Sequence, residues 1–308
     1  MSINLSAITE TPTIISSQLI QSLNTDQSQQ ATLEQQLATG DLVNQPSDNP
    51  SAASSLMQLN AGVARANQYS TNAADGLGWL SLANSTVNSV MSNLQTARQL
   101  VLSVSGSSLS GSQTAVSAVA SQLQSIKDQI VALANTQYGG QALFSGTGNV
   151  TAAFQQDGKY IGGGNAPTRT VAPGVTVPVS VTGNVLFGPS TTDPNGLLTP
   201  GTGSLDAVIQ DLKNGKLQQA QTTDLSNLDA SIQNVSDAAA SLGASYQRMQ
   251  GFATQATNAQ AALQSQISAL DSVNVAQATT QLAQEQQTYQ TGLWATAQIE
   301  SHSLVQYL

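Results

Sequence analysis

The chain has 308 residues and a formal net charge of −9, yet only 8% of its residues are charged, against roughly 25% in an ordinary globular domain. Its eight Lys and Arg residues are scattered between Arg65 and Arg248, so no cluster is expected to neutralise the phosphates of a nucleic acid or of an anionic membrane. The absence of cysteine excludes a disulfide framework, a thiolate metal site and a cysteine nucleophile.

The first predicted element is a helix in the N-terminal region. Its apolar residues share one heptad stripe, with the polar Asp26 and Gln30 in the middle: Leu19, Leu23, Leu33 and Leu37. A half-polar stripe of this kind is too weak to hold an isolated helix together. The N-terminus also lacks the basic start and apolar core of a secretory signal, and no stretch approaches the ~20 apolar residues of a membrane span.

A long helix is predicted near 51–104. Asn49 is a suitable N-cap, and Pro50 suits the first helical position, where a missing N–H costs nothing. One heptad column is apolar at every step: Leu59, Ala66, Ala73, Leu80, Val87, Leu94 and Val101. A companion column is more mixed: Leu56, Val63, Ser70, Leu77, Asn84, Met91 and Arg98.

After a Gly/Ser break, a second apolar series predicts another helix. It begins at Val116, runs toward Tyr138 and is expected to stop at Gly139-Gly140. Residues 144–203 are rich in Gly, Pro, Thr and Val, and they predict a small β-rich insertion. Pro173 and Pro178 suit edge strands or turns there.

A short helix near 204–214 leads back to a second long helix near 222–271. Each of the two longest helices would span roughly 75 Å. Their matched lengths and sustained 3.5-residue period predict a mainly α, elongated helical bundle or coiled coil. We divide it into terminal helices (1–45 and 272–308), a long bundle (46–143 and 204–271) and the outer insertion (144–203).

The C-terminal segment carries an apolar stripe of its own. Residues within about 60° of arc on an ideal helix are Val275, Leu282, Tyr289, Leu293, Leu304 and Tyr307. Trp294, Ile299 and Val305 lie off that stripe. One face can pair with the N-terminal helix, and the residues off the stripe need a second partner. That partner is either another subunit, which we favour, or the rest of the same chain. Before assembly these ends should be partly disordered, because neither buries enough apolar area.

Two segments resemble the bacterial flagellin superfamily. The first is Leu37-Ala-Thr-Gly-Asp-Leu-Val-Asn-Gln-Pro-Ser-Asp-Asn-Pro-Ser-Ala-Ala, whose motif residues are Asn44, Pro46, Asp48, Asn49 and Pro50. The family usually has a basic residue where this chain has Leu42. The second segment combines Gln-x-x-Tyr-Gln at 286–290 with a closing Ser-Leu-x-x-Tyr-Leu. Within the superfamily, Leu143-Phe-Ser-Gly-Thr and the final Tyr-Leu are similar to the hook-associated protein 3 (hook–filament junction) family.

The resemblance implies a structural subunit of the bacterial flagellum, with the terminal helices paired in an inner coiled-coil layer. It implies an adaptor at the hook–filament junction, and the alternative is flagellin, the self-polymerising filament subunit. The expected partners are other flagellar axial proteins, copies of the chain and an export chaperone. The expected location is the extracellular flagellum, reached by type III export without a cleaved signal peptide.

No residues predict catalysis. His302 is the only histidine, and a lone histidine is far more often a polar helix residue than a base or ligand. Asp48 and Asn49 fit a turn and an N-cap better than a metal site. We therefore expect no enzyme activity, no cofactor and no metal. A surface built on Gln, Ser and Thr titrates little, so stability should also vary weakly with pH.

Overall fold

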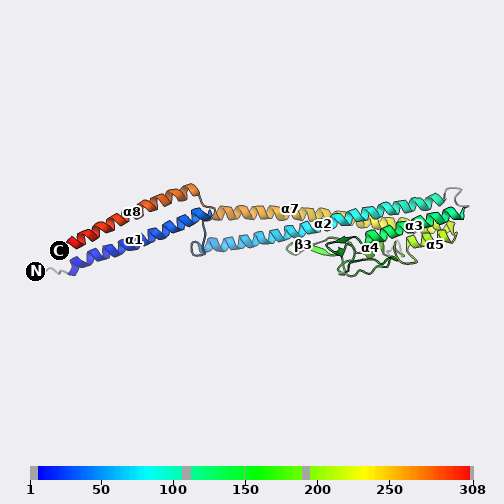
Figure 1. The fold of residues 1–308 in the computed structure, drawn as a ribbon, viewed down its shortest axis with the longest axis horizontal. Helices are drawn as coiled ribbons and strands as arrows, with labels where there is room; N and C mark the ends of the chain where they lie inside the picture. The colour runs from blue at the N-terminus through cyan, green and yellow to red at the C-terminus, as the bar shows by residue number, and fades with distance from the viewer. Residues whose placement is uncertain (1–5, 106–111, 149, 189–194, 306–308) are drawn as a thin grey trace. The chain divides into compact units, whose positions relative to one another are not determined.

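The protein is described from a computed structural model. It describes the backbone of residues 6–105, 112–148, 150–188 and 195–305, and the side chains of 17–104, 112–148, 150–188 and 195–298. Figure 1 shows the elements, which in chain order are α1 (Ser6–Thr39), α2 (Pro50–Ser105), α3 (Gln113–Ala134), β1 (Gln137–Tyr138), β2 (Gln141–Ala142), β3 (Thr168–Ala172), β4 (Val175–Pro178), α4 (Gly183–Phe187), α5 (Ser204–Lys213), α6 (Leu217–Gln219), the π-helical turn η2 (Ala220–Asp224), α7 (Leu225–Asp271) and α8 (Val275–Val305). The prediction of a mainly helical bundle with a small insertion is confirmed.

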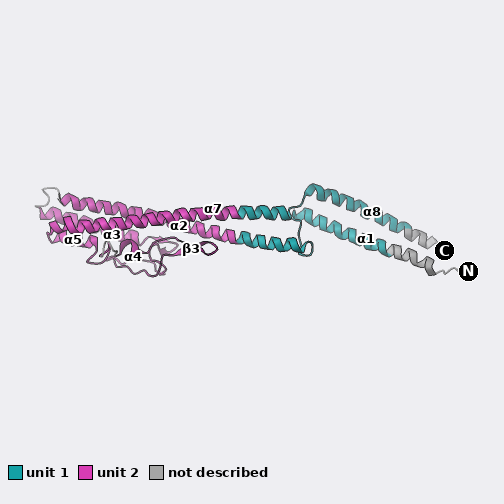
Figure 2. Ribbon diagram, turned by 180° about the vertical axis from the view of Figure 1, so that it is seen from behind, with its two compact units in different colours: residues 1–64, 260–308 teal, residues 65–259 magenta. Residues whose placement is uncertain are grey.

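The contacts divide the chain into two units, coloured in Figure 2. Unit 1 contains residues 1–64 and 260–308, and unit 2 contains residues 65–259. Helices α2 and α7 each contribute residues to both units.

In unit 1, α1 packs along α8 in antiparallel fashion. The side-chain amide of Gln30 donates to the backbone carbonyl of Glu285 at 3.0 Å. Farther along the same pair, a Cβ placed on Gly292 would approach Leu23 Cδ2 to 2.8 Å. Leu23 is buried by this contact, so the absent side chain at Gly292 lets the helices come close.

In unit 2, α2 buries its predicted apolar column. From Ala66 to Val101 all six members of that column are buried, whereas Leu59, in unit 1, is half-buried. The second buried column of α2 is not the predicted companion column. Each of its members lies three residues after a member of the predicted apolar column: Gly76, Ala83, Val90, Ala97 and Val104. Its residues are small, which allows neighbouring helices to approach closely: a Cβ on Gly76 would lie 2.5 Å from Met249 Cε.

Helix α3 ends earlier than predicted. It stops at Ala134, with Asn135 as C-cap, because the Asn135 side chain binds the insertion. Its Oδ1 accepts the N–H groups of Ala153 and Phe154, each at 2.8 Å. The Gly139-Gly140 pair, with φ of 58° and 84°, forms the turn between β1 and β2. The glycines therefore close a hairpin and do not end the helix.

The insertion contains the antiparallel hairpin of β3 and β4, as the alternating β-branched residues predict. Pro173 and Gly174 form its turn, and Gly174 has a φ of 71°, which favours glycine. Pro178 ends β4. The short helix α4 was not predicted, and its Phe187 packs against Phe144 and Phe154. Helix α5 occupies the place predicted for a short helix.

Candidate assembly surface and the joint that supports it

The predicted assembly residues divide into two sets in the structure. Leu23 is buried in the α1–α8 pair, and five others are half-buried: Leu19, Leu33, Leu37, Leu282 and Tyr289. Three are exposed: Val275 by 58%, Leu293 by 45% and Trp294 by 79%. The side chains of Ile299, Leu304 and Val305, and that of His302, lie outside the described residues. Pairing of α1 with α8 therefore uses only part of the apolar surface of α8.

Sequence reasoning missed three further exposed apolar side chains in unit 1. Ile20 on α1 is 48% exposed, Leu42 is 45% exposed, and Met57 near the start of α2 is 66% exposed. Ile20 and Met57 directly follow residues of the predicted stripes, Leu19 and Leu56. An adjacent apolar pair on a helix faces two directions, and this signal could have identified both residues.

A hydrogen-bonded joint connects the end of α1 with the α7–α8 turn. Gly40, with a φ of 81°, ends α1 by donating to Gln36 O at 2.8 Å. Its own carbonyl accepts the Val273 N–H at 3.0 Å, and Asp271 O accepts the Leu42 N–H at 2.5 Å. The Asp271 carboxylate accepts the Val43 N–H at 2.9 Å. These bonds tie the two terminal helices together where each meets the rest of the chain.

The motif residues hold the turn that follows this joint. The carboxylate oxygen Oδ2 of Asp48 accepts the N–H groups of Asn44 at 3.1 Å and Gln45 at 2.9 Å. The Asn44 side chain donates to Asp41 O at 3.0 Å. Asn49 Oδ1 accepts the Ala52 N–H at 3.1 Å, and helix α2 begins one residue after Asn49. The N-cap prediction for Asn49 and the turn role predicted for Asp48 are confirmed.

Pro46 and Pro50 complete the motif. Pro46 is exposed within the turn, and Pro50 is the first residue of α2. The Leu42 side chain is half exposed while its backbone N–H bonds to Asp271. The bond that position 42 contributes to the joint is therefore made by the backbone, and about half of the Leu42 side chain stays exposed.

Replacing Asp48 by alanine is expected to lower the free energy of unfolding of unit 1 by about 1–2 kcal/mol, because two backbone N–H groups lose their charged acceptor. Hydrogen exchange of the amides of Asn44 and Gln45 should accelerate by a corresponding factor. Ser47→Ala, one residue away on the exposed turn, is the matched control. Unchanged exchange in Asp48→Ala would contradict the assigned role.

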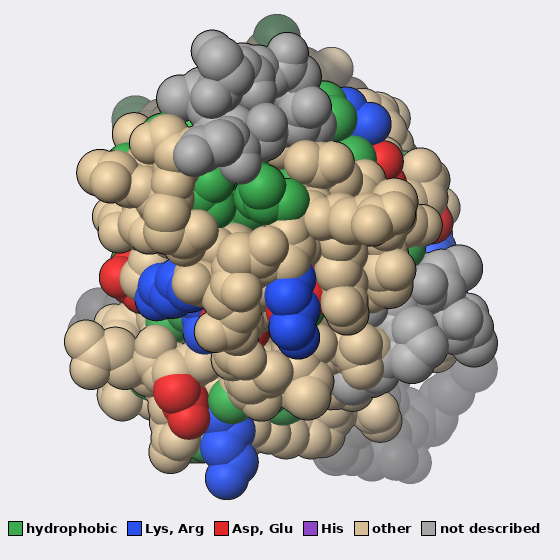
Figure 3. Space-filling view, turned by 90° about the vertical axis from the view of Figure 1, so that its right-hand side faces the viewer, with side chains coloured by type: hydrophobic (Ala, Val, Ile, Leu, Met, Phe, Trp, Pro, Cys, Tyr) green, Lys and Arg blue, Asp and Glu red, His purple; other side chains and the backbone are tan. Residues whose placement is uncertain are grey.

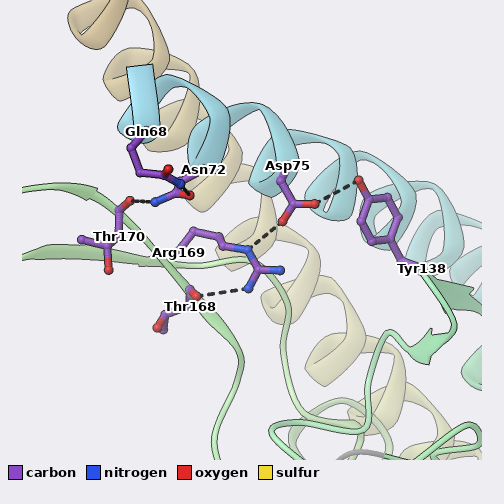
Figure 4. A network of polar contacts seen from close by, with 7 residues as sticks. All are labelled: Gln68, Asn72, Asp75, Tyr138, Thr168, Arg169 and Thr170. Carbon is purple, nitrogen blue, oxygen red and sulfur yellow. Dashed lines mark hydrogen bonds and ion pairs between the residues drawn. The ribbon is translucent and has the colours of Figure 1, made fainter. Parts of the chain in front are cut away.

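In unit 2 the hairpin β3–β4 is attached to α2 by a polar network (Figure 4). Arg169 Nε binds Asp75 Oδ2 at 2.7 Å, and the Arg169 guanidinium lies 5.5 Å from the centre of the Trp79 ring. Asn72 donates to Thr170 O at 2.8 Å. The network therefore attaches the hairpin of the insertion to α2.

Other polar residues of the insertion have local structural roles. Asp157 accepts the N–H of Lys159 at 2.9 Å, and the Tyr160 hydroxyl donates to Phe144 O at 3.2 Å. Burial raises the pKa of Tyr160 above its ordinary value, which keeps this hydroxyl a donor. Together with Arg169, these residues stabilise the fold of the insertion.

The exposed surface is mostly uncharged. Figure 3 shows one face on which a few acidic and basic side chains and several small apolar areas lie among backbone and uncharged side chains. Among the described residues, no group of three His, Asp or Glu side chains could hold a metal ion. Within the same part of the chain, no helix is both long enough and apolar enough to cross a membrane.

Known proteins match both ends of the chain. Residues 12–149 match the bacterial flagellin N-terminal helical region, and residues 225–308 match the bacterial flagellin C-terminal helical region. The chain is 29% identical over 226 residues to flagellar hook-associated protein 3 of Escherichia coli (strain K12), which covers 68% of this chain and 71% of that protein. It is 32% identical over 167 residues to the protein of the same name from Salmonella typhimurium, which covers 54% of this chain and 52% of the relative. The chain thus spans about half the length of the Salmonella protein.

Among solved structures, a flagellar hook-associated protein from Vibrio parahaemolyticus is similar with a TM-score of 0.63 and 25% identity, covering 72% of this chain and 99% of that one. The two matched flagellin regions together occupy most of the chain, they coincide with its long helices, and they contain the motif at Asn44–Pro50. The chain therefore belongs to the bacterial flagellin family of structural proteins.

Proposed function

We propose that this protein is the adaptor at the hook–filament junction of a bacterial flagellum. The observation that carries the proposal is its similarity to two relatives that are both named flagellar hook-associated protein 3. The alternative within the family is flagellin, the self-polymerising filament subunit. The Leu143-Phe-Ser-Gly-Thr segment and the closing Tyr-Leu favour the junction protein.

The proposed assembly follows the division of the helices. Residues 1–45 and 272–308 form an inner coiled-coil layer, residues 46–143 and 204–271 form the surrounding bundle, and residues 144–203 form the outer insertion. The antiparallel pairing of α1 with α8 supports the first of these assignments. The exposed side chains of Leu293 and Trp294 would contact neighbouring axial subunits or copies of the chain.

The same terminal helices explain the proposed route to the flagellum. Few of their described side chains are buried, so their isolated stability is low. Helices that fold fully only on assembly suit export as a thin chain through the type III channel, without a cleaved signal peptide. A cytoplasmic chaperone would cover the C-terminal apolar residues before export.

Deletion of the gene distinguishes the two functions. If the protein is the junction adaptor, electron microscopy should show bare hooks, and monomeric flagellin should accumulate in the medium. Hooks without released flagellin would instead identify the filament subunit. Intact flagella on swimming cells would contradict both functions.

Substitution of Trp294 tests the proposed intersubunit surface. Trp294→Ser should change the free energy of unfolding of the isolated protein by less than about 0.5 kcal/mol, because the side chain is 79% exposed. It should nevertheless reduce the number of filaments per complemented cell severalfold, since a large aromatic contact would be lost. Val185→Ser is a matched control, because Val185 is 63% exposed on α4. Normal filament numbers with Trp294→Ser would exclude Trp294 from the interface.

A further inference from the structure

Two buried carboxylates lie where α5 meets the turn that precedes α7. Asp224, the last residue of the π-helical turn η2, is 3% exposed, and Asp211 near the end of α5 is 8% exposed. Helix α5 packs against η2. One carboxylate oxygen of Asp224, Oδ2, is buried and has no hydrogen-bond partner. A buried acceptor without a hydrogen-bond donor costs free energy, so a donor for this oxygen would stabilise the folded state. The corner is also unusual because π-helical turns are rare.

The surrounding charges do not supply that donor. Lys216 Nζ lies 3.3 Å from Asp211 Oδ1, and its side chain is 57% exposed, so this cation binds Asp211 from the solvent side. The charged groups on the other packed elements are paired elsewhere or exposed: Asp206 pairs with Lys127, Asp229 pairs with Arg98, and Lys213 is exposed. The Asp211 carboxylate lies within hydrogen-bonding reach of Asp224, and Lys216, bound to Asp211, also acts on Asp224.

We propose that Asp224 takes up a proton from mildly acidic solvent and donates it in a hydrogen bond to Asp211, which ties η2 to α5 and stabilises this corner of unit 2. Two carboxylates enclosed together cannot both ionise without cost. The shared proton removes one of the two negative charges and gives the unpartnered oxygen a partner. The step balances: an O–H bond forms on Asp224 as an O–H bond of a hydronium ion breaks, water is released, and the new O–H donates to an Asp211 oxygen.

The direction of the pH dependence follows from the environment of Asp224. Burial, and then the charge and hydrogen bonding of Asp211, raise its pKa to about 6, while Lys216 acts in the opposite direction. The folded-state pKa lies above the ordinary value of 3.8, so the folded state binds this proton more tightly than the unfolded state. The contribution to stability is therefore complete below about 3.8, decreases as the pH rises through about 6, and is lost at higher pH.

This behaviour adds a local exception to the weak pH dependence that the low charge content predicts. The exception has the opposite sign to ordinary acid denaturation, in which carboxylates that are paired or hydrogen-bonded in the folded state must be protonated at a cost. A subunit with such a pair gains local stability when the medium becomes mildly acidic.

The test compares the wild-type protein with Asp224→Asn, whose amide can donate to Asp211 at every pH. Between pH 7 and pH 5 the equilibrium constant for folding of the wild type should rise about tenfold relative to that of Asp224→Asn. Asp237→Asn is the matched control, because Asp237 lies exposed on α7 and accepts a hydrogen bond from Gln233. This control should follow the wild type. Parallel pH profiles for the wild type and Asp224→Asn would overturn the proposal.

A second measurement does not depend on the folding of the variant. Carboxyl carbon resonances of the wild-type protein with labelled aspartate can be followed by NMR from pH 8 to pH 3. One aspartate should titrate with a midpoint near 6. If every aspartate resonance titrates with a midpoint below about 4.5, Asp224 holds no proton in mild acid and the proposal is wrong.

Discussion

Replacing Phe187 by alanine is expected to lower the free energy of unfolding of unit 2 by about 3–5 kcal/mol. Phe187 is 1% exposed. Its ring meets those of Phe144 and Phe154 edge to face, at centroid distances of 6.1 and 5.4 Å. Removing the ring eliminates both aromatic contacts and leaves a cavity. Helix α4 cannot move freely to close it, because the Gly183 N–H is bonded to Phe144 O at 2.7 Å.

The measurement is denaturant unfolding followed by fluorescence of Trp79, which is buried in unit 2. The chain has two tryptophans, so a Trp294→Phe background makes the signal specific for that unit. Val185→Ala is the control, since Val185 lies two residues away on α4 with its side chain 63% exposed. It should cost less than about 0.5 kcal/mol. Equal effects for the two variants would show that the aromatic cluster contributes little.

Replacing Lys127 by alanine is expected to lower the same free energy by about 3 kcal/mol or more. Lys127 Nζ lies 2.6 Å from Asp206 Oδ1, and the two side chains are only 8% and 13% exposed. Without the ammonium group, the Asp206 carboxylate stays enclosed between α3 and α5. Its second oxygen keeps the Gly201 N–H at 2.8 Å, which limits the loss to the lower part of the range for broken buried ion pairs.

The double variant Lys127→Met/Asp206→Asn separates the value of the pair from the cost of an unpaired charge. It should recover most of the lost stability, because neither remaining side chain carries a buried charge. Lys213→Ala, on the exposed side of α5, is the single-charge control and should be close to neutral. A double variant as unstable as Lys127→Ala would mean that the loss comes from the interaction between the two side chains, and not from the unpaired charge.

The sequence by itself determined the long helices and the start of α2. Their apolar columns recur over many turns, and a signal summed over 40 or more residues survives local exceptions. Asn49 and Pro50 have preferences that depend only on the local backbone. The short helix α5 was also predictable. So was the hairpin around Pro173-Gly174, because glycine is favoured at a turn position that requires a positive φ.

Only the tertiary structure decided which small residues lie in the core. Gly76 and Ala83 carry little hydrophobic signal, and they are buried because neighbouring helices approach them closely. Tertiary structure also decided where α3 ends. The helix stops before Asn135, whose side chain accepts hydrogen bonds from the N–H groups of Ala153 and Phe154.

The polar contacts between distant parts of the chain could not be predicted from local sequence patterns either. The sequence separations from Asp75 to Arg169, Lys127 to Asp206 and Val43 to Asp271 are 94, 79 and 228 residues. No local pattern relates such residues, since each bond forms only after the chain has folded back on itself. The exposure of individual side chains also depended on tertiary structure. The apolar stripes of α1 and α8 predicted that the two helices pair, but only the geometry of the pair decided that Leu23 is buried and Trp294 is exposed. A contact between two helices covers only one face of each.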